Sequence, residues 1–182
     1  QEILAEFIED GGSVFRGVRT AASARVLTHA EPGRRYVMGV DWGKTEDFTV
    51  ITVIDDETGE VVRVDRFNQI DYTVQRGRVV SAFEAFHPAT VVVERNSIGE
   101  PLIEELVRSG LPVQPFTTSN ASKSLIIDAL ALAFERGDVR IPDDPSLLAE
   151  LEALEMERLP GGSFRYAAPS GMHDDMVMSL AF

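Results

Sequence analysis

The chain has 182 residues, 44% hydrophobic and 26% charged, which is typical of a single globular domain and excludes a disordered or fibrous protein. Thirty acidic against 17 basic residues give a formal net charge of −13, so contact with nucleic acid requires a local basic patch, a bound cation or a partner domain. Cysteine is absent, which excludes disulfides, thiolate zinc sites and a cysteine nucleophile and fits a reducing compartment, and no apolar run approaches the roughly 20 residues that span a bilayer.

The first 35 residues differ from the rest of the chain. Residues 1–10 place apolar side chains at helical spacing, which predicts a short amphipathic helix that Gly11 and Gly12 end. Residues 13–35 carry five arginines and show little periodicity, so we expect a solvated connector there. We therefore predict a linker segment over 1–35 and a folded domain over 36–182.

The segment after the linker predicts three strands. Residues 36–41 form a nearly continuous apolar run, typical of a strand that is buried on both faces. Residues 48–54 and 61–67 are rich in β-branched side chains and are joined by a short loop that contains glycine, which predicts an antiparallel meander. Because side chains alternate along a strand, we expect Val62 and Val64 on one face.

The remainder of the chain alternates helices and strands. Apolar stripes at helical spacing lie at 72–86, 102–107, 125–133, 147–154 and 172–182, and two further strands are expected at 91–94 and 111–116. Gly161 and Gly162 predict a turn before a short extended piece at 163–166. A right-handed crossover makes the fourth strand parallel to the first. The predicted fold is therefore α/β, with a mixed five-stranded central sheet flanked by helices: the first three strands are antiparallel, and the fourth and fifth are parallel to the first.

Carboxylates stand at three ends of these elements. Asp41 ends the first strand, Glu94 ends the fourth, and Asp174 and Asp175 open the last helix. Parallel pairing makes the two strand ends neighbours, and the last helix, packed on the same sheet, can direct its aspartates to the same point. Because the unpaired charges repel, a divalent cation that prefers hard oxygen ligands, Mg²⁺ or Mn²⁺, would stabilise the group.

Each carboxylate also has a purely structural interpretation. Asp41 could be a turn-forming residue after a core strand, and Asp174 or Asp175 could cap the N-terminus of the last helix. Glu94 could form a surface ion pair with Arg95 or Lys123, which contributes little.

Three motifs resemble the nuclease domain of the large terminase subunit, the DNA-packaging motor of tailed bacteriophages. They are Val-Asp-Trp-Gly at 40–43, Val-Val-Glu at 92–94 and, most specifically, His-Asp-Asp-Met-Val-Met-Ser-Leu-Ala at 173–181. Residues 117–130 resemble the lysine-containing segment of that family, and residues 1–15 resemble the linker that follows its ATPase domain. The resemblance covers nearly the whole chain and implies a ribonuclease H-like fold.

The resemblance also implies an activity and the residues that carry it. It implies a Mg²⁺- or Mn²⁺-dependent endodeoxyribonuclease that cleaves double-stranded DNA concatemers during phage genome packaging by two-metal-ion hydrolysis. Asp41 would bridge the two ions, Glu94 would hold one and Asp175 the other, with Asp174 as a further ligand or an orienting group.

The implied partners are double-stranded DNA, a preceding ATPase domain of the same polypeptide, the portal protein and the small terminase subunit. The implied location is the host bacterial cytoplasm, with no membrane. The phosphate loop of the ATPase half, G-x-x-x-x-G-K-[ST], is absent from this sequence, as expected for an isolated nuclease domain.

Five further residues are candidates for supporting roles. Asp47 could join the carboxylates or form an Asx turn, and His173 could neighbour a ligand or lie in the core, the interpretation we favour. Lys123 precedes a helix start that could bind a DNA phosphate, or it could be a solvated lysine. Arg76 and Arg78 are the next candidates for DNA contact.

Other functional classes remain open from the sequence. A different ribonuclease H-like nuclease, such as a Holliday-junction resolvase, would share the fold. An actin-like ATPase or sugar kinase would need a second Asp-Gly phosphate loop, which residues 95–182 lack. An inactive docking module would use the carboxylates only as caps. Metal binding separates the nuclease from the docking module, and nucleotide binding would indicate the kinase.

Overall fold

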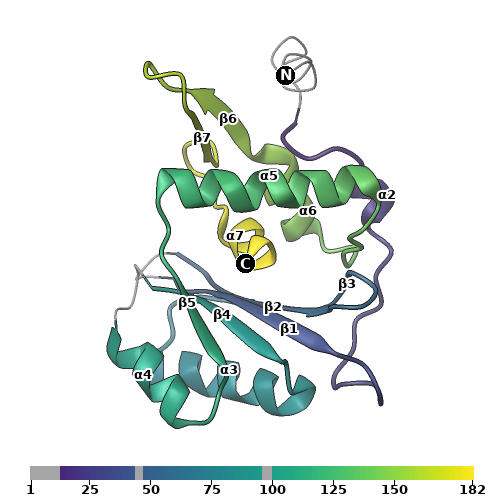
Figure 1. The fold of residues 1–182 in the computed structure, drawn as a ribbon, viewed down its shortest axis with the longest axis vertical. Helices are drawn as coiled ribbons and strands as arrows, with labels where there is room; N and C mark the ends of the chain where they lie inside the picture. Colours follow the sequence, from purple (N-terminus) through teal and green to yellow (C-terminus); the bar gives the residue numbers. More distant parts are fainter. Residues whose placement is uncertain (1–12, 44–46, 96–99) are drawn as a thin grey trace.

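A five-stranded sheet with helices on both faces forms the centre of the computed structural model, which describes residues 13–43, 47–95 and 100–182 (Figure 1). The strands of the sheet are β1 (Tyr36–Asp41), β2 (Thr49–Asp55), β3 (Glu60–Phe67), β4 (Thr90–Glu94) and β5 (Val113–Phe116). The helices are α2 (Val18–Ala21), α3 (Tyr72–Phe86), α4 (Glu100–Arg108), α5 (Asn120–Arg136), α6 (Pro145–Ala153) and α7 (Asp175–Ala181). A separate hairpin consists of β6 (Glu155–Arg158) and β7 (Phe164–Ala167).

The sheet has the predicted topology. Its strand order is β3-β2-β1-β4-β5; β1 and β3 are antiparallel to β2, whereas β4 is parallel to β1 and β5 is parallel to β4. In the β1–β4 register Val40 lies opposite Val93, so the next residues along, Asp41 and Glu94, lie at the same end of two adjacent strands. The predicted α/β class and strand directions are confirmed.

Helices α3 and α4 cover one face of the sheet, and α5, α6 and α7 cover the other (Figure 1).

The capping residue and the prolines lie where the sequence predicts them. Asp71 caps α3 by accepting a hydrogen bond from the Thr73 backbone N–H at 2.7 Å, and α3 ends at Phe86, with His87 as its C-cap directly before Pro88. Pro112 and Pro115 fall beside or within β5, an edge strand, where a missing N–H costs least. Along the described ranges, no helix combines the length and apolarity needed to cross a membrane.

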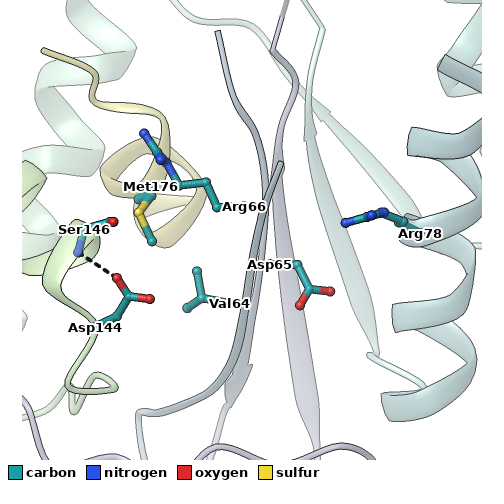
Figure 2. Close-up of a pocket in the computed structure, with 7 residues that line it drawn as sticks. All are labelled: Val64, Asp65, Arg66, Arg78, Asp144, Ser146 and Met176. Carbon is teal, nitrogen blue, oxygen red and sulfur yellow. Dashed lines mark hydrogen bonds between the residues drawn. The ribbon is translucent and has the colours of Figure 1, made fainter. Parts of the chain in front are cut away.

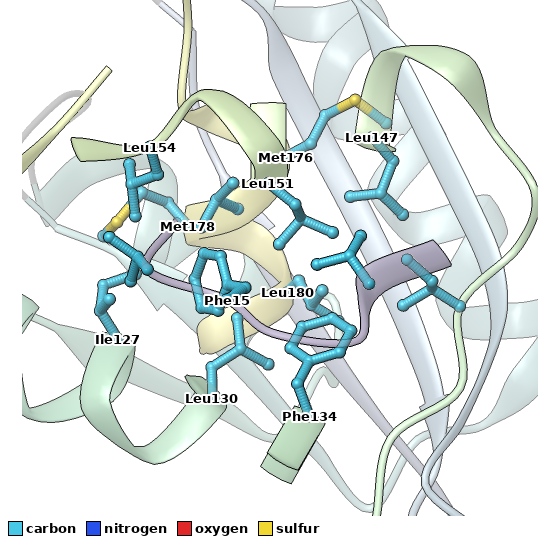
Figure 3. Close-up of a cluster of buried hydrophobic side chains, with 14 of the residues drawn as sticks. Phe15, Ile127, Leu130, Phe134, Leu147, Leu151, Leu154, Met176, Met178 and Leu180 are labelled. Carbon is cyan, nitrogen blue, oxygen red and sulfur yellow. The ribbon is translucent and has the colours of Figure 1, made fainter. Parts of the chain in front are cut away.

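The segment before the sheet is not the solvated connector that we expected. Val14, Phe15 and Val18 are only 2–6% exposed, and the Phe15 ring packs against the Phe134 ring of α5 with centroids 5.5 Å apart (Figure 3). The segment lacks helical periodicity because its one described helix, α2, has only four residues. The helix predicted within residues 1–10 lies outside the described residues, and the boundary between 35 and 36 stays a prediction.

A β-bulge corrects the expectation for the third strand. Ile54 pairs with Val61, but Val53 pairs with Arg63, so Val62 is an extra residue in β3. An extra residue inverts the alternation of side chains. Val62 is therefore buried on the α3 side of the sheet, whereas Val64 packs on the opposite side, and the prediction that they share a face is wrong.

The hairpin of β6 and β7 was only half predicted. The extended piece at 163–166 is confirmed as part of β7, whereas its partner β6 was not predicted. Contacts with α5 hold β7: the Tyr166 hydroxyl donates to Asp128 at 2.5 Å, and the Asn120 side-chain amide donates to the Phe164 carbonyl at 2.8 Å.

Candidate active site

The position of the last helix depends on a close contact between α7 and the centre of the sheet. A Cβ atom on Gly39 would lie 2.1 Å from the Ser179 carbonyl oxygen, so only glycine lets α7 approach β1 this closely. The Ser179 hydroxyl lies 3.0 Å from the Gly39 carbonyl oxygen and 2.9 Å from the Thr52 hydroxyl. With its middle held over β1 and β2, α7 directs its N-terminus toward the ends of the strands that carry the carboxylates.

The strand ends and the helix start meet at Asp41. Asp41 is 9% exposed at the end of β1, and Glu94 is half-buried at the adjacent end of β4. The Phe48 backbone N–H, just before β2, donates to Asp175 Oδ2 at 3.1 Å and so joins α7 to the same region. The sequence-predicted residues Asp41, Glu94, Asp174 and Asp175 come from three elements and lie close enough for the charges of the other three to act on Asp41.

The electrostatics of this centre disfavour the charged forms of its buried carboxyls. Burial raises the pKa of the Asp41 carboxyl well above its ordinary range, and the nearby charges of Glu94, Asp175 and Asp174 raise it further, against a small opposing effect of Lys123. Burial also raises the pKa of Asp175, although the Phe48 N–H and His173 oppose that shift. Asp41 is thus a buried carboxylate surrounded by like charges, which argues against a simple turn residue.

Asp174 does not act as a helix cap. It occupies the N-cap position of α7, but its side chain makes no capping hydrogen bond. Its Oδ2 instead accepts from the Lys123 ammonium at 2.6 Å, in an ion pair whose two side chains are 18% and 23% exposed. The capping interpretation of Asp174 and the solvated-lysine interpretation of Lys123 are both wrong. Lys123 lies in the first turn of α5, which begins at Asn120, so the prediction that it precedes the helix is wrong, and a DNA contact by Lys123 stays a prediction.

His173 and Asp47 lie on the outer side of the centre. His173 Nδ1 is 3.6 Å from Asp175 Oδ2 and 3.9 Å from Asp47 Oδ1, and its ring meets the Phe48 ring edge-on at 5.2 Å. Its side chain is 36% exposed, so the interpretation as a core histidine is wrong. His173 is a neighbour of Asp175, and Asp47 is a more exposed acidic group beside it.

The structure places Arg76 and Arg78 on α3, on the face of the sheet opposite α7 (Figure 1). Arg76 lies 3.5 Å from Glu105, and the Arg78 guanidinium lies over the Phe67 ring at 4.5 Å. No described contact joins Arg76 or Arg78 to the four carboxylates. A role of either arginine in DNA contact stays a prediction.

Two residues next to the centre were missed from the sequence. Glu150 of α6 is 5% exposed and accepts a hydrogen bond from the Met176 backbone N–H at 2.8 Å. Arg66 of β3 lies 3.4 Å from the other Glu150 oxygen, and its guanidinium lies 3.3 Å from the Phe48 ring centroid. The signal available for Glu150 was the presence of an acidic residue within the apolar stripe at 147–154.

A hollow of about 410 Å³ lies beside β3 but does not include the carboxylates. Figure 2 shows Arg66 and Met176 on one side of the strand and Asp65 and Arg78 on the other. The hollow therefore touches α7 only at Met176 and is not the carboxylate centre.

The donor set suits a hard divalent cation. Four carboxylates offer the oxygen ligands that Mg²⁺ and Mn²⁺ prefer, and the charges of Glu94, Asp175 and Asp174 add to burial in raising the pKa of Asp41. In the part of the chain that the structure describes, no group of three or more His, Asp or Glu side chains lies close enough to hold a metal ion as it stands. Like charges without a cation repel, so ligation would draw these side chains inward.

A mixed five-stranded sheet in this order, with helices on both faces and carboxylates at the adjoining ends of β1 and β4, defines a ribonuclease H-like domain. The family model described as the terminase RNaseH-like domain matches residues 38–181. The chain belongs to this family of terminase ribonuclease H-like domains.

Two relatives show how far the similarity extends. The large terminase subunit of Thermus virus P23-45 is 33% identical over 190 residues, which cover all of this chain and 39% of that relative. The crystal structure of the large terminase nuclease from thermophilic phage G20c matches with a TM-score of 0.84 and 31% identity, over 93% of this chain and 96% of that one. Structures of the same G20c nuclease with bound magnesium and with bound cobalt match equally well, at 0.84.

Proposed function

We propose that this chain is a Mg²⁺- or Mn²⁺-dependent endonuclease that cleaves double-stranded DNA concatemers during phage genome packaging. The observation that carries the proposal is the buried Asp41, whose carboxyl pKa is raised by burial and by three further carboxylates, Glu94, Asp175 and Asp174. Such a concentration of negative charge is unfavourable unless a cation binds it. The magnesium- and cobalt-bound structures of the G20c nuclease support the same conclusion.

Each carboxylate has a place in the proposed site. Asp41, the most buried, would bridge two ions, Glu94 would hold one, and Asp175 would hold the other with Asp174 beside it. Bound divalent ions would lower the pKa of a water nucleophile and stabilise the charge on the leaving 3′ oxygen. The Phe48 N–H orients Asp175 toward the centre, and Lys123 holds Asp174 and partly offsets the negative field.

The partners follow from the family and the chain length. Because the chain spans 39% of its P23-45 relative, we propose that it works next to an ATPase domain of the same polypeptide. That linkage would bring DNA to a domain of net charge −13, which repels DNA by itself. We further propose contacts with the portal protein and the small terminase subunit in the host cytoplasm.

The test is cleavage of supercoiled plasmid DNA by the 182-residue chain. We expect nicking and linearisation with Mg²⁺ or Mn²⁺ and none in EDTA, because the proposed hydrolysis needs a water that is activated by a bound divalent ion. Ca²⁺ should support far less activity, since two-ion hydrolysis depends on coordination geometry. Equal cleavage in EDTA would refute the proposal. Failure to bind Mn²⁺ would instead indicate an inactive docking module.

A further inference from the structure

The first turn of α7 is not capped by its own sequence. The N-cap residue Asp174 makes no capping bond, and its carboxylate is directed to Lys123. The first N–H groups of a helix have no partner within the helix and need an acceptor from elsewhere. An aspartate at this position would normally supply it.

Glu150 supplies that acceptor from another helix. Its Oε2 accepts from the Met176 N–H at 2.8 Å, 26 residues along the chain. Glu150 is 5% exposed on α6, between Leu148 and Leu151. Burying a carboxylate there costs free energy, and an apolar residue of similar volume is often at least as stabilising. Folding stability alone therefore does not explain the glutamate.

Arg66 connects Glu150 to the other side of Asp175. Its Nη2 lies 3.4 Å from Glu150 Oε1, and its guanidinium stacks on the Phe48 ring at 3.3 Å. The Phe48 N–H in turn donates to Asp175 Oδ2 at 3.1 Å. The Met176 amide and the Asp175 carboxylate are thus linked through Glu150, Arg66 and Phe48, and Arg66 and Met176 line the same hollow (Figure 2).

We propose that Glu150 is a positioning residue that caps α7 in place of Asp174, so that both Asp174 and Asp175 stay directed into the carboxylate centre. Arg66 offsets part of the buried charge of Glu150 through the 3.4 Å ion pair, although the facing Glu150 Oε1 has no hydrogen-bond partner among the described residues. This inference rests on the proposed function, because it assigns the two aspartates to metal binding. It adds a residue outside the centre on which metal affinity depends.

The experiment compares Glu150→Met, which keeps volume but removes the acceptor, with Glu150→Gln, which keeps an acceptor oxygen. Glu152→Ala is the matched control, since Glu152 lies on the same helix but pairs with Arg19 at the surface. The readouts are hydrogen exchange of the Met176 amide, Mn²⁺ affinity by calorimetry, the Mg²⁺ concentration for half-maximal cleavage, and the melting temperature.

For Glu150→Met we expect the Met176 amide to exchange roughly tenfold faster or more. We expect Mn²⁺ affinity to fall and the Mg²⁺ concentration for half-maximal cleavage to rise by a similar factor, the effect of removing a group that orients a ligand, while the chain stays folded. Glu150→Gln should stay within about threefold of the unmodified chain, because its amide oxygen still accepts the hydrogen bond. Glu152→Ala should change none of the readouts.

Unchanged metal affinity in Glu150→Met would overturn the proposal, as would a Glu150→Gln chain impaired as much as Glu150→Met. A Glu150→Met chain that unfolds would also count against it, because the carboxylate would then be a folding requirement. If the unmodified chain neither binds metal nor cleaves DNA, the proposed function fails instead, and Met176 exchange still reports whether Glu150 caps α7.

Discussion

The contact between Gly39 and α7 allows a sharp test of how the centre is assembled. In Gly39→Ala the new Cβ would lie 2.1 Å from the Ser179 carbonyl oxygen and 3.2 Å from the Phe182 Cβ. Ordinary van der Waals contact begins at about 3.4 Å, so α7 would have to retreat from β1 by roughly 1.3 Å. The clash involves backbone, which cannot move aside as a flexible side chain can.

Two consequences follow from a shift of this size. Overpacking of a core contact costs about 1–3 kcal/mol, which for a domain of this length lowers the melting temperature by roughly 2–12 °C. Because α7 carries Asp174 and Asp175, its displacement also moves two proposed ligands, and a misplacement of about 1 Å can cost 100-fold in rate. We expect metal-dependent cleavage to fall by about that factor at temperatures where the variant remains folded.

Gly77→Ala is the matched control, because Gly77 lies in the exposed part of α3 and a Cβ there meets nothing within 4 Å. Alanine favours a helix over glycine by about 1 kcal/mol, so this variant should melt a few degrees higher and cleave normally. The assays are thermal unfolding by circular dichroism and plasmid cleavage with saturating Mg²⁺. If Gly39→Ala melts and cleaves like the unmodified chain, α7 does not depend on this contact and our account of the site is wrong.

Three further predictions test the charges of the centre. Asp41→Asn should lower the cleavage rate by at least about 100-fold, since a bound ion contributes several kcal/mol to stabilising the transition state. The melting temperature without metal should stay equal or rise, because the substitution removes repulsion between carboxylates. An unfolded variant would instead show that Asp41 is a structural residue. Lys123→Ala should weaken cleavage without changing Mn²⁺ affinity and lower the salt slope of DNA binding by roughly one, whereas superimposable salt series would exclude a DNA contact. In EDTA, the raised pKa values of Asp41, Asp175 and Glu150 mean that these three groups contribute most to stability below the unfolded carboxyl pKa of about 4, and that this contribution is lost as the pH rises through the raised native values. Thermal melts at several pH values measure this, and Asp41→Asn should flatten the curve.

Short segments of the sequence were enough to predict the strands of the sheet and the positions of the four carboxylates at the ends of elements. The apolar run at 36–41 required a buried strand, and so fixed Asp41 at a strand end without knowledge of any other element. The cap at Asp71 and the stop before Pro88 defined α3, and the crossover rule then made β4 parallel to β1 and brought Glu94 beside Asp41. These features follow from local periodicity, turn chemistry and chain handedness, all of which are encoded within short segments.

The contacts that hold those groups in place come from long-range packing. The pairing of Lys123 with Asp174, the capping of α7 by Glu150 and the contact of Phe15 with α5 join residues far apart in the chain, and no local pattern specifies such partners. Asp174 has the sequence signature of a helix cap, yet a buried carboxylate from α6 takes that role. A hydrogen-bond acceptor for a helix start can come from any part of the chain that packs nearby. Which of several suitable side chains supplies it therefore depends on tertiary packing and cannot be predicted from the sequence of the helix itself.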